Sequence, residues 1–223
     1  MPRDAYKRLE ERPEVIRAIR DRVLSFLELG RKGRTHYSFQ PYFEVEFDAD
    51  VFSELAFCIS TANSSAFSGL RFQEMLAEKK GRVNESWLLN TLKECGVRFY
   101  QKKARYIWEA WQMLDDVIEL LKLRESTMIR EWLVENIRGF GYKEASHFLR
   151  NTGHLDVAVV DRHVLNWLYQ EGYIPSWRNF DSSKRRDYLA LEKLLCGVAH
   201  LKKMQVGELD LLIWWKMTGK VLK

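Results

Sequence analysis

The sequence predicts an all-α protein, because three kinds of residue are spaced as helices require. Apolar residues recur at intervals of three and four along most of the chain, as at Val15, Ile19 and Val23, which places them on one face of a helix. Asp50 and Ser126 stand before such runs, where an N-cap is expected. Glycines that follow apolar runs are expected as helix C-caps: Gly96, Gly153, Gly172 and Gly219.

One segment departs from the helical spacing. Between Tyr37 and Phe47, aromatic and polar residues alternate around Pro41, with Phe43 and Val45 on the same side as Phe47. A period of two is typical of an extended chain. We therefore expect a short extended segment or the arm of a hairpin here.

Composition bounds the class of protein. The 223 residues carry 36 Lys and Arg against 31 Asp and Glu, a net charge of +5 that favours a polyanionic partner. Cys58, Cys95 and Cys196 lie far apart, which predicts neither a zinc site nor an iron–sulfur cluster. We find no leader and no apolar run of bilayer length, and we expect a cytoplasmic protein that does not enter a membrane.

The segment from Trp132 to Trp167 carries the chemistry. A helix that ends near Ile137 is followed by Gly139 and Gly141 and then by a new helix, so the glycines predict a very short hairpin between two helices. Backbone N–H groups at such a helix start can bind a phosphate. A plain connection between two helices would show the same two glycines.

Asp161 stands at the N-cap position of the helix that runs through Leu168. An aspartate there ordinarily contributes about 1 kcal/mol to helix stability and has no other role. Here it follows the glycine hairpin and Lys143 by one short helix and a loop, which can bring Lys143 and Asp161 to opposite sides of one cleft.

These residues resemble the helix-hairpin-helix DNA glycosylases, in which a hairpin and a loop precede an essential aspartate. The archaeal-type 8-oxoguanine DNA glycosylase/lyases are the most similar branch, because the chain lacks iron–sulfur cysteines and ends in lysine. The resemblance implies one glycosylase domain over 1–223, with two helical subdomains flanking a DNA-binding cleft. We expect one subdomain at about 50–150, with the hairpin at 137–143, and the other at about 1–49 plus 151–223.

The same resemblance implies a reaction and its residues. Lys143 is expected as the nucleophile that forms a Schiff base with the sugar, and Asp161 as the carboxylate that stabilises cationic character at C1′. Excision of 8-oxoguanine would be followed by β-elimination at the apurinic site. The reaction needs no metal and no cofactor, and we expect a monomer that acts on double-stranded DNA containing oxidised guanine.

Further residues are expected at the DNA on the same grounds. His163 matches a position that contacts a phosphate, and Asn63, after the helix near Ile59, is the candidate for filling the gap left by a flipped base. Small polar residues near Asn63 can equally just end that helix. The α-carboxylate of Lys223 is expected to bind the base, and Trp214 to stack on it; a buried Trp and a frayed terminus are the alternative.

Two other readings stay open. A noncatalytic helix-hairpin-helix module that only binds DNA backbone would share the glycine turn, although it would have no use for Asp161. A structural helical protein with a fortuitous turn would not bind DNA. Within the enzyme class, a glycosylase for a different damaged base is an alternative, because pocket shape decides lesion choice.

Overall fold

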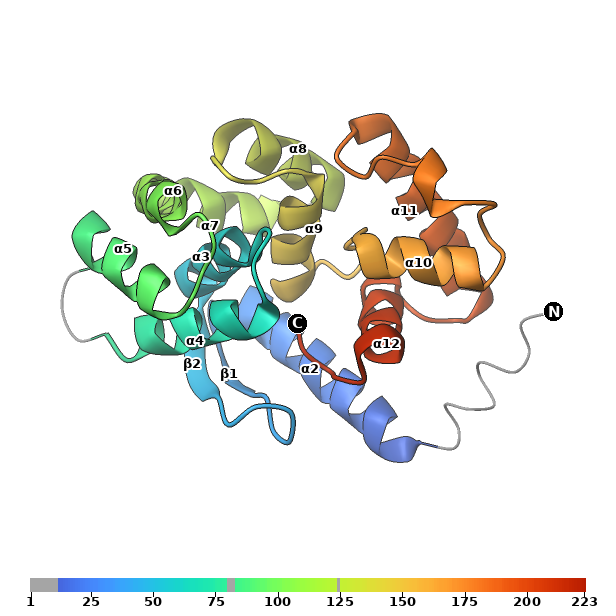
Figure 1. Cartoon of the computed structure of the whole chain (residues 1–223), viewed down its shortest axis with the longest axis horizontal. Coiled ribbons are helices and arrows are strands. Elements are labelled where there is room, and N and C mark those ends of the chain that lie inside the picture. Colours follow the sequence, from blue (N-terminus) through green and yellow to red (C-terminus); the bar gives the residue numbers. More distant parts are fainter. Residues whose placement is uncertain (1–11, 80–82, 124) are drawn as a thin grey trace.

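The computed structural model describes residues 12–79, 83–123 and 125–223, and helices dominate this part of the chain (Figure 1). The predicted all-α class is confirmed, with one two-stranded sheet added to the helices. The elements are α2 (Pro13–Lys32), β1 (Arg34–Ser38), β2 (Glu46–Asp50), α3 (Val51–Thr61), α4 (Ala66–Ala77), α5 (Glu85–Glu94), α6 (Tyr100–Gln112), α7 (Leu114–Leu123), α8 (Ser126–Asn136), α9 (Tyr142–Asn151), α10 (Arg162–Gln170), η1 (Trp177–Asn179), α11 (Arg185–Leu201) and α12 (Val206–Thr218).

The sheet is an antiparallel hairpin, so the predicted hairpin is confirmed, although residues 39–45 of the predicted segment form the turn between its strands and are not extended. Strands β1 and β2 pair with Tyr37 opposite Phe47. Alternate residues are buried on one face, where the rings of Tyr37, Phe39 and Phe47 lie within about 6 Å of one another. Contacts of this face with α2 and α4 make the hairpin part of the core.

Helix α3 is the centre of the fold. Asp50 caps it, because the Asp50 carboxylate accepts from the Ser53 backbone N–H at 2.7 Å and the Ser53 hydroxyl accepts from the Asp50 backbone N–H. Every residue from 51 to 60 is buried, since α4, α6 and α9 all pack against this helix. Its mostly apolar sequence therefore suits a helix that is covered on every side.

The helices form two groups, as Figure 1 shows, with α3 to α8 on one side of the vertical α9 and α10 to α12 on the other. Helix α2 crosses below and contacts both α9 and α12. The chain ends between the groups, near α4 and α12 in Figure 1. The predicted arrangement of two helical groups is confirmed, and the residue limits given above for the subdomains stay a prediction.

Helix ends follow the sequence with corrections at both kinds of end. Gly96, Gly153 and Gly172, predicted as C-caps, each have a positive φ but lie one residue beyond the actual C-caps, which are Cys95, Thr152 and Glu171. Gly219 ends α12 in the left-handed region, with φ of +75°. The predicted cap at Ser126 is wrong, because Glu125 is the N-cap and Ser126 is the first residue of α8. The Ser126 hydroxyl instead contacts His154 (3.0 Å) and Asp156 (2.5 Å), and so fastens α8 to the loop after α9. No helix among the described residues is long and apolar enough to cross a membrane.

Candidate active site

The hairpin between α8 and α9 lies where the two glycines predict it, and they play different roles. Gly139 has φ of +89°, and a Cβ there would lie 2.9 Å from the Tyr106 ring, so only glycine fits. Gly141 has φ of −106°, which any residue adopts. Its N–H donates to Glu144 Oε2 at 3.2 Å, so a phosphate that approaches this turn must compete with the Glu144 carboxylate.

Lys143 lies in the first turn of α9, directly after the hairpin. Its side chain is about one-third exposed (36%), and its Nζ lies 2.9 Å from Glu144 Oε1. One carboxylate, that of Glu144, therefore contacts both the Lys143 amine and the Gly141 amide. A ligand that displaces Glu144 would free both groups at once.

Asp161 caps α10, as predicted. Its Oδ1 atom accepts from the N–H groups of His163 (2.8 Å) and Val164 (3.0 Å). These two bonds fix the direction of the half-buried carboxylate, and no group among the described residues donates to Oδ2. Asp161 thus presents one oriented oxygen with unused acceptor capacity.

The loop before Asp161 is held by three side chains from α11 and α12 that sequence reasoning missed. They bind three consecutive backbone N–H groups, so the chain that leads into Asp161 has a fixed course. The pairs are Ala158 N with Glu192 Oε1 (3.0 Å), Val159 N with Asp210 Oδ2 (3.0 Å) and Val160 N with the Tyr188 hydroxyl (3.3 Å).

Two of these side chains are also paired with buried arginines. Arg150 Nη1 lies 2.5 Å from Asp210 Oδ1, and Arg130 Nη1 lies 2.6 Å from Glu192 Oε1. Burial raises the pKa of Asp210 to about 6, and the charge of Asp161 adds to the rise, while Arg150 opposes it. The visible signal in the sequence is an acidic residue inside an apolar run, as Asp210 is in Leu209–Ile213.

The turn with Asn63 is held from α6 by Lys103. Asn63 is exposed with φ of +55°, in the left-handed region. The Lys103 amine donates to the carbonyls of Ser60 (2.8 Å) and Ala62 (2.6 Å) and to the Ser64 hydroxyl (3.0 Å). Burial lowers the pKa of Lys103 to about 8, and the charge of Lys143 lowers it further. The Asn63 turn therefore lies within electrostatic range of the α9 amine.

Phe99 is a second exposed residue near this turn. It is 57% exposed with φ of +58°, and the N–H of the preceding Arg98 donates to the Ser64 hydroxyl at 2.9 Å. It is unusual for an aromatic residue on a protein surface to combine an exposed side chain with a left-handed backbone conformation. Apolar periodicity carries no signal for this exposure, because in the sequence Phe99 is an ordinary apolar residue before a helix.

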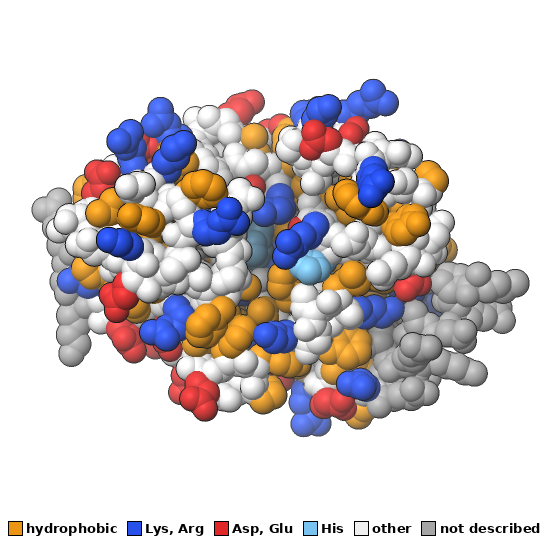
Figure 2. Space-filling view, in the orientation of Figure 1, with side chains coloured by type: hydrophobic (Ala, Val, Ile, Leu, Met, Phe, Trp, Pro, Cys, Tyr) orange, Lys and Arg blue, Asp and Glu red, His pale blue; other side chains and the backbone are white. Residues whose placement is uncertain are grey.

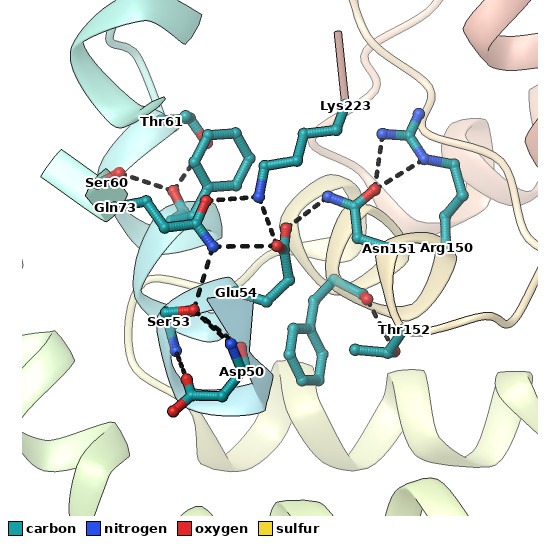
Figure 3. A network of polar contacts seen from close by, with 12 residues as sticks. Asp50, Ser53, Glu54, Ser60, Thr61, Gln73, Arg150, Asn151, Thr152 and Lys223 are labelled. Carbon is teal, nitrogen blue, oxygen red and sulfur yellow. Dashed lines mark hydrogen bonds and ion pairs between the residues drawn. The ribbon is translucent and has the colours of Figure 1, made fainter. Parts of the chain in front are cut away.

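The C-terminal lysine is docked in the protein interior, as Figure 3 shows. The Lys223 amine donates to Glu54 Oε2 and to Gln73 Oε1, each at 2.5 Å, and lies 4.0 Å from the centre of the Phe57 ring. Both ends of the Lys223–Glu54 pair are fully buried. Asn151 donates to the other Glu54 oxygen at 2.6 Å, so α3, α4 and α9 together hold the end of the chain.

Two effects of opposite sign act on the pKa of the Lys223 amine. Burial lowers the pKa of Lys223 to about 8, whereas the charge of Glu54 raises it. Val221, Leu222 and Lys223 are all buried, so the end of the chain is packed and the alternative of a frayed terminus is wrong. The role expected for the α-carboxylate of Lys223 stays a prediction, and sequence reasoning missed Glu54 and Gln73, which bind the side chain of the same residue.

His163 and Trp214 are brought into contact. Their rings lie edge to face, with centres 4.8 Å apart, and both side chains are half-buried. The indole Nε1 of Trp214 is buried and has no partner among the described residues. The contact links the helix that Asp161 caps to α12, and the predicted roles of both rings at DNA stay predictions.

One face of the molecule is hollowed near its middle. Figure 2 shows this hollow in the middle of one face, with Lys and Arg side chains around it and a histidine within it. The charge of Lys143 lowers the pKa of Lys103, and the charge of Asp161 raises the pKa of Asp210. Lys143 and Asp161 do not contact each other, and the described residues contain no cluster of three or more His, Cys, Asp or Glu that could hold a metal ion.

Comparison with known proteins identifies the family. The model of the 8-oxoguanine DNA glycosylase family with the helix-hairpin-helix motif matches residues 34–204. The chain belongs to the 8-oxoguanine DNA glycosylase family. An 8-oxoguanine DNA glycosylase/AP lyase of Aquifex aeolicus is 41% identical over 95% of each chain, and one of Methanocaldococcus jannaschii is 42% identical over 81% of this chain and 86% of its own.

Solved structures of this family have the same fold. The 8-oxoguanine DNA glycosylase of Thermotoga maritima superposes with a TM-score of 0.81 at 36% identity, over 99% of both chains. The 8-oxoguanine glycosylase/lyase of Methanocaldococcus jannaschii, in complex with 15mer DNA containing 8-oxoguanine, superposes with a TM-score of 0.76 at 38% identity, over 92% of this chain and 91% of that one. The resemblance stated from the sequence is confirmed.

Proposed function

We propose that this chain is a bifunctional DNA repair enzyme, which excises 8-oxoguanine from double-stranded DNA and then cleaves the strand at the apurinic site. Membership of the family supports the reaction class, since relatives that this chain matches over almost their full length are 8-oxoguanine DNA glycosylase/AP lyases. The observation that carries the assignment within the structure is the Asp161 cap, which directs one unpaired carboxylate oxygen from the start of α10.

Lys143 is the nucleophile in this proposal. Its uncharged amine forms a bond to C1′ while the C1′–N9 bond breaks, and the purine leaves with the bonding electrons and one proton from the amine. The second amine proton goes to O4′ as the sugar ring opens to an imine. Asp161 stabilises the positive charge that develops at C1′ as the base departs.

The lyase step uses the same imine. Loss of the C2′ proton sends electrons toward the imine and breaks the C3′–O bond, so the strand is cut 3′ to the lesion and the phosphate leaves on the downstream strand. No metal ion takes part in this sequence. Glu144 contacts the Lys143 amine and is the nearest base that the structure offers to receive a proton.

Recognition is assigned to residues on both sides of the hollow. Gly139, Gly141 and His163 contact DNA phosphates, Asn63 fills the gap left by the flipped nucleotide, and the α-carboxylate of Lys223 with the ring of Trp214 binds the base. The ordered position of Lys223 supports this, because its side chain is fixed by Glu54 and Gln73. The predicted monomeric state and cytoplasmic location are retained as parts of the proposal.

Borohydride trapping on a duplex with one 8-oxoguanine tests the assignment. The wild-type protein should give a covalent complex, and Lys143→Gln should give none. Lys102→Gln removes an exposed lysine of α6 and serves as the control, which should trap like the wild type. A full-strength complex with Lys143→Gln would refute the nucleophile, and a wild-type protein that binds DNA without excision on any lesion duplex would favour the noncatalytic module.

A further inference from the structure

Tyr142 is the first residue of α9 and directly precedes the proposed nucleophile, Lys143. Its hydroxyl group donates a hydrogen bond to Glu131 of α8 and accepts one from Arg185 of α11, whose Nε atom lies 2.7 Å away. Arg185 Nη2 also lies 3.0 Å from Glu131 Oε1, so the three side chains form a closed triangle of contacts. Because α8 and α11 belong to different helical groups (Figure 1), this triangle joins the two groups beside Lys143.

The aromatic ring of Tyr142 packs on a second tyrosine. Its centre lies 5.6 Å from the centre of the Tyr188 ring. The guanidinium carbon of Arg130 lies 5.6 Å from the centre of the first ring and 5.8 Å from that of the second, within the range of a cation–π interaction. Arg130 is buried and pairs with Glu192 of α11. Contacts with α11 therefore fix the ring of Tyr142 as well as its hydroxyl group.

Tyr188 extends these contacts to the loop before Asp161. Its side chain is fully buried, and its hydroxyl group donates to the Ala158 carbonyl at 2.7 Å and accepts from the Val160 N–H at 3.3 Å. Val160 is the residue before Asp161. Two packed tyrosines therefore connect the neighbour of Lys143 with the neighbour of Asp161.

The proposed reaction needs a fixed geometry between the two residues that these tyrosines connect. The Lys143 amine attacks C1′, and the Asp161 carboxylate stabilises charge at the same atom, so both must be placed relative to a single carbon. The two side chains do not contact each other, and their separation therefore depends on contacts made by other residues. A displacement of about 1 Å can lower a rate about a hundred-fold.

We propose that Tyr142 is a positioning residue, which sets the separation of Lys143 and Asp161 through Tyr188. Two charged side chains hold its hydroxyl group, and its ring transmits that position to the loop that leads into Asp161. Tyr142 acts through these contacts and takes no part in the making or breaking of bonds. This inference rests on the proposed function.

Single-turnover kinetics test the proposal by separating base excision from strand cleavage. Tyr142→Phe removes the hydroxyl group and keeps the ring, whereas Tyr142→Leu removes both. Excision of 8-oxoguanine should fall about three- to tenfold in Tyr142→Phe and about ten- to a hundred-fold in Tyr142→Leu. In Tyr142→Phe, cleavage at a preformed apurinic site should stay within about twofold of wild type, because the free aldehyde is captured without a departing base for Asp161 to assist. Affinity for an undamaged duplex should not change in this variant.

Tyr173→Phe is the matched control, because Tyr173 is also half-buried and packs on another aromatic ring, that of Trp167. It should excise like the wild type. A double-mutant cycle of Tyr142→Phe with Tyr188→Phe tests the route of the effect. If Tyr142 acts through Tyr188, the loss of excision in the double variant should be clearly smaller than the product of the two single losses. Losses that multiply would overturn the proposal, and so would wild-type excision by Tyr142→Phe.

Thermal melts control for folding. Tyr142→Phe keeps the packed ring and should remain folded, so it carries the test if Tyr142→Leu unfolds. A merely structural role would lower stability, excision and apurinic-site cleavage together in Tyr142→Phe, and that result would contradict the proposal. A wild-type protein that fails to excise 8-oxoguanine would instead refute the proposed function, so the two failures are distinguishable.

Discussion

Glu54→Gln is the sharpest perturbation of the site, because it removes one charge from a pair that is wholly buried. The Lys223 amine lies 2.5 Å from Glu54 Oε2, and neither side chain is exposed at all. Glutamine has nearly the same shape and can still accept from Asn151, but its NH2 group then faces the Lys223 amine and Gln73 Nε2, which are both donors. The substitution therefore changes charge with little change in packing, and it leaves the Lys223 ammonium without its anion.

The expected loss of stability is large, although the substitution replaces only one carboxylate oxygen by an amide nitrogen. Removal of one partner from a buried ion pair costs about 3–5 kcal/mol, because the remaining charge is desolvated and unpaired. For a chain of this length, each kcal/mol lowers the melting temperature by about 2–4 °C, so the melting temperature of Glu54→Gln should fall by roughly 6–20 °C. The loss of stability is smaller if the Lys223 side chain leaves its buried position. Excision of 8-oxoguanine should then fall even where the protein stays folded.

The double variant Glu54→Gln/Lys223→Met is the matched control. Methionine fills the same space without charge and keeps a terminal α-carboxylate, so much of the stability and some of the excision should return. Thermal melts and single-turnover excision on the same samples measure both quantities. A loss below about 1 kcal/mol in Glu54→Gln, or a double variant that is less stable than the single one, would refute this account of the docked terminus.

Three further outcomes follow from the geometry. Gly139→Ala should destabilise the protein by about 1–3 kcal/mol in urea unfolding, whereas Gly141→Ala should leave stability nearly unchanged and weaken DNA binding; equal stabilities would contradict the difference in φ. Tyr188→Phe removes a hydroxyl that accepts a hydrogen bond from the loop before the α10 cap. The rate of excision should therefore fall several-fold, with little change in affinity for undamaged DNA. An unchanged excision rate would show that Tyr188 does not position the cap. Burial holds the folded-state pKa of Lys103 at about 8, below its unfolded value of roughly 10.4. The unfolded chain therefore binds more protons between pH 8 and 10, and the free energy of unfolding of wild type should rise with pH relative to Lys103→Met, by up to about 1.4 kcal/mol per unit; parallel pH profiles would speak against the shift.

Local features of the fold were predictable because they depend on residues close in sequence. The hairpin needs Gly139 for its positive φ, and the cap at Asp161 needs only the two N–H groups that follow it. The β-hairpin was visible as an alternation of aromatic and polar residues from Tyr37 to Phe47, although residues 39–45 form its turn. In each case a rule of backbone geometry or of period acts within about ten residues.

Contacts between distant segments were not predictable in this way. Glu54 and Lys223 are 169 residues apart, and the sequence near either residue does not indicate that the other is its partner. The same holds for Asp210, which binds the amide of Val159 from α12. What the sequence does show is an acidic residue inside an apolar helix, which predicts that a partner exists because an unpaired buried charge is too costly. The partner's identity requires the tertiary structure.

The buried charges of this protein have a distribution that stability alone does not explain. An ion pair in the interior contributes little net stability compared with apolar residues of the same size, yet it permits only one orientation of its partners. Here, Asp210 and Glu192 each use one carboxylate for an arginine and for an amide of the loop before Asp161, and Glu54 fixes the last residue of the chain. Several of the buried charges therefore lie at the loop before Asp161 and at Lys223, the two segments to which the proposed function assigns a direction. In the proposed function this placement serves orientation, because the helices could pack without these groups, but the loop before Asp161 and the Lys223 side chain would then lose the contacts that fix their positions.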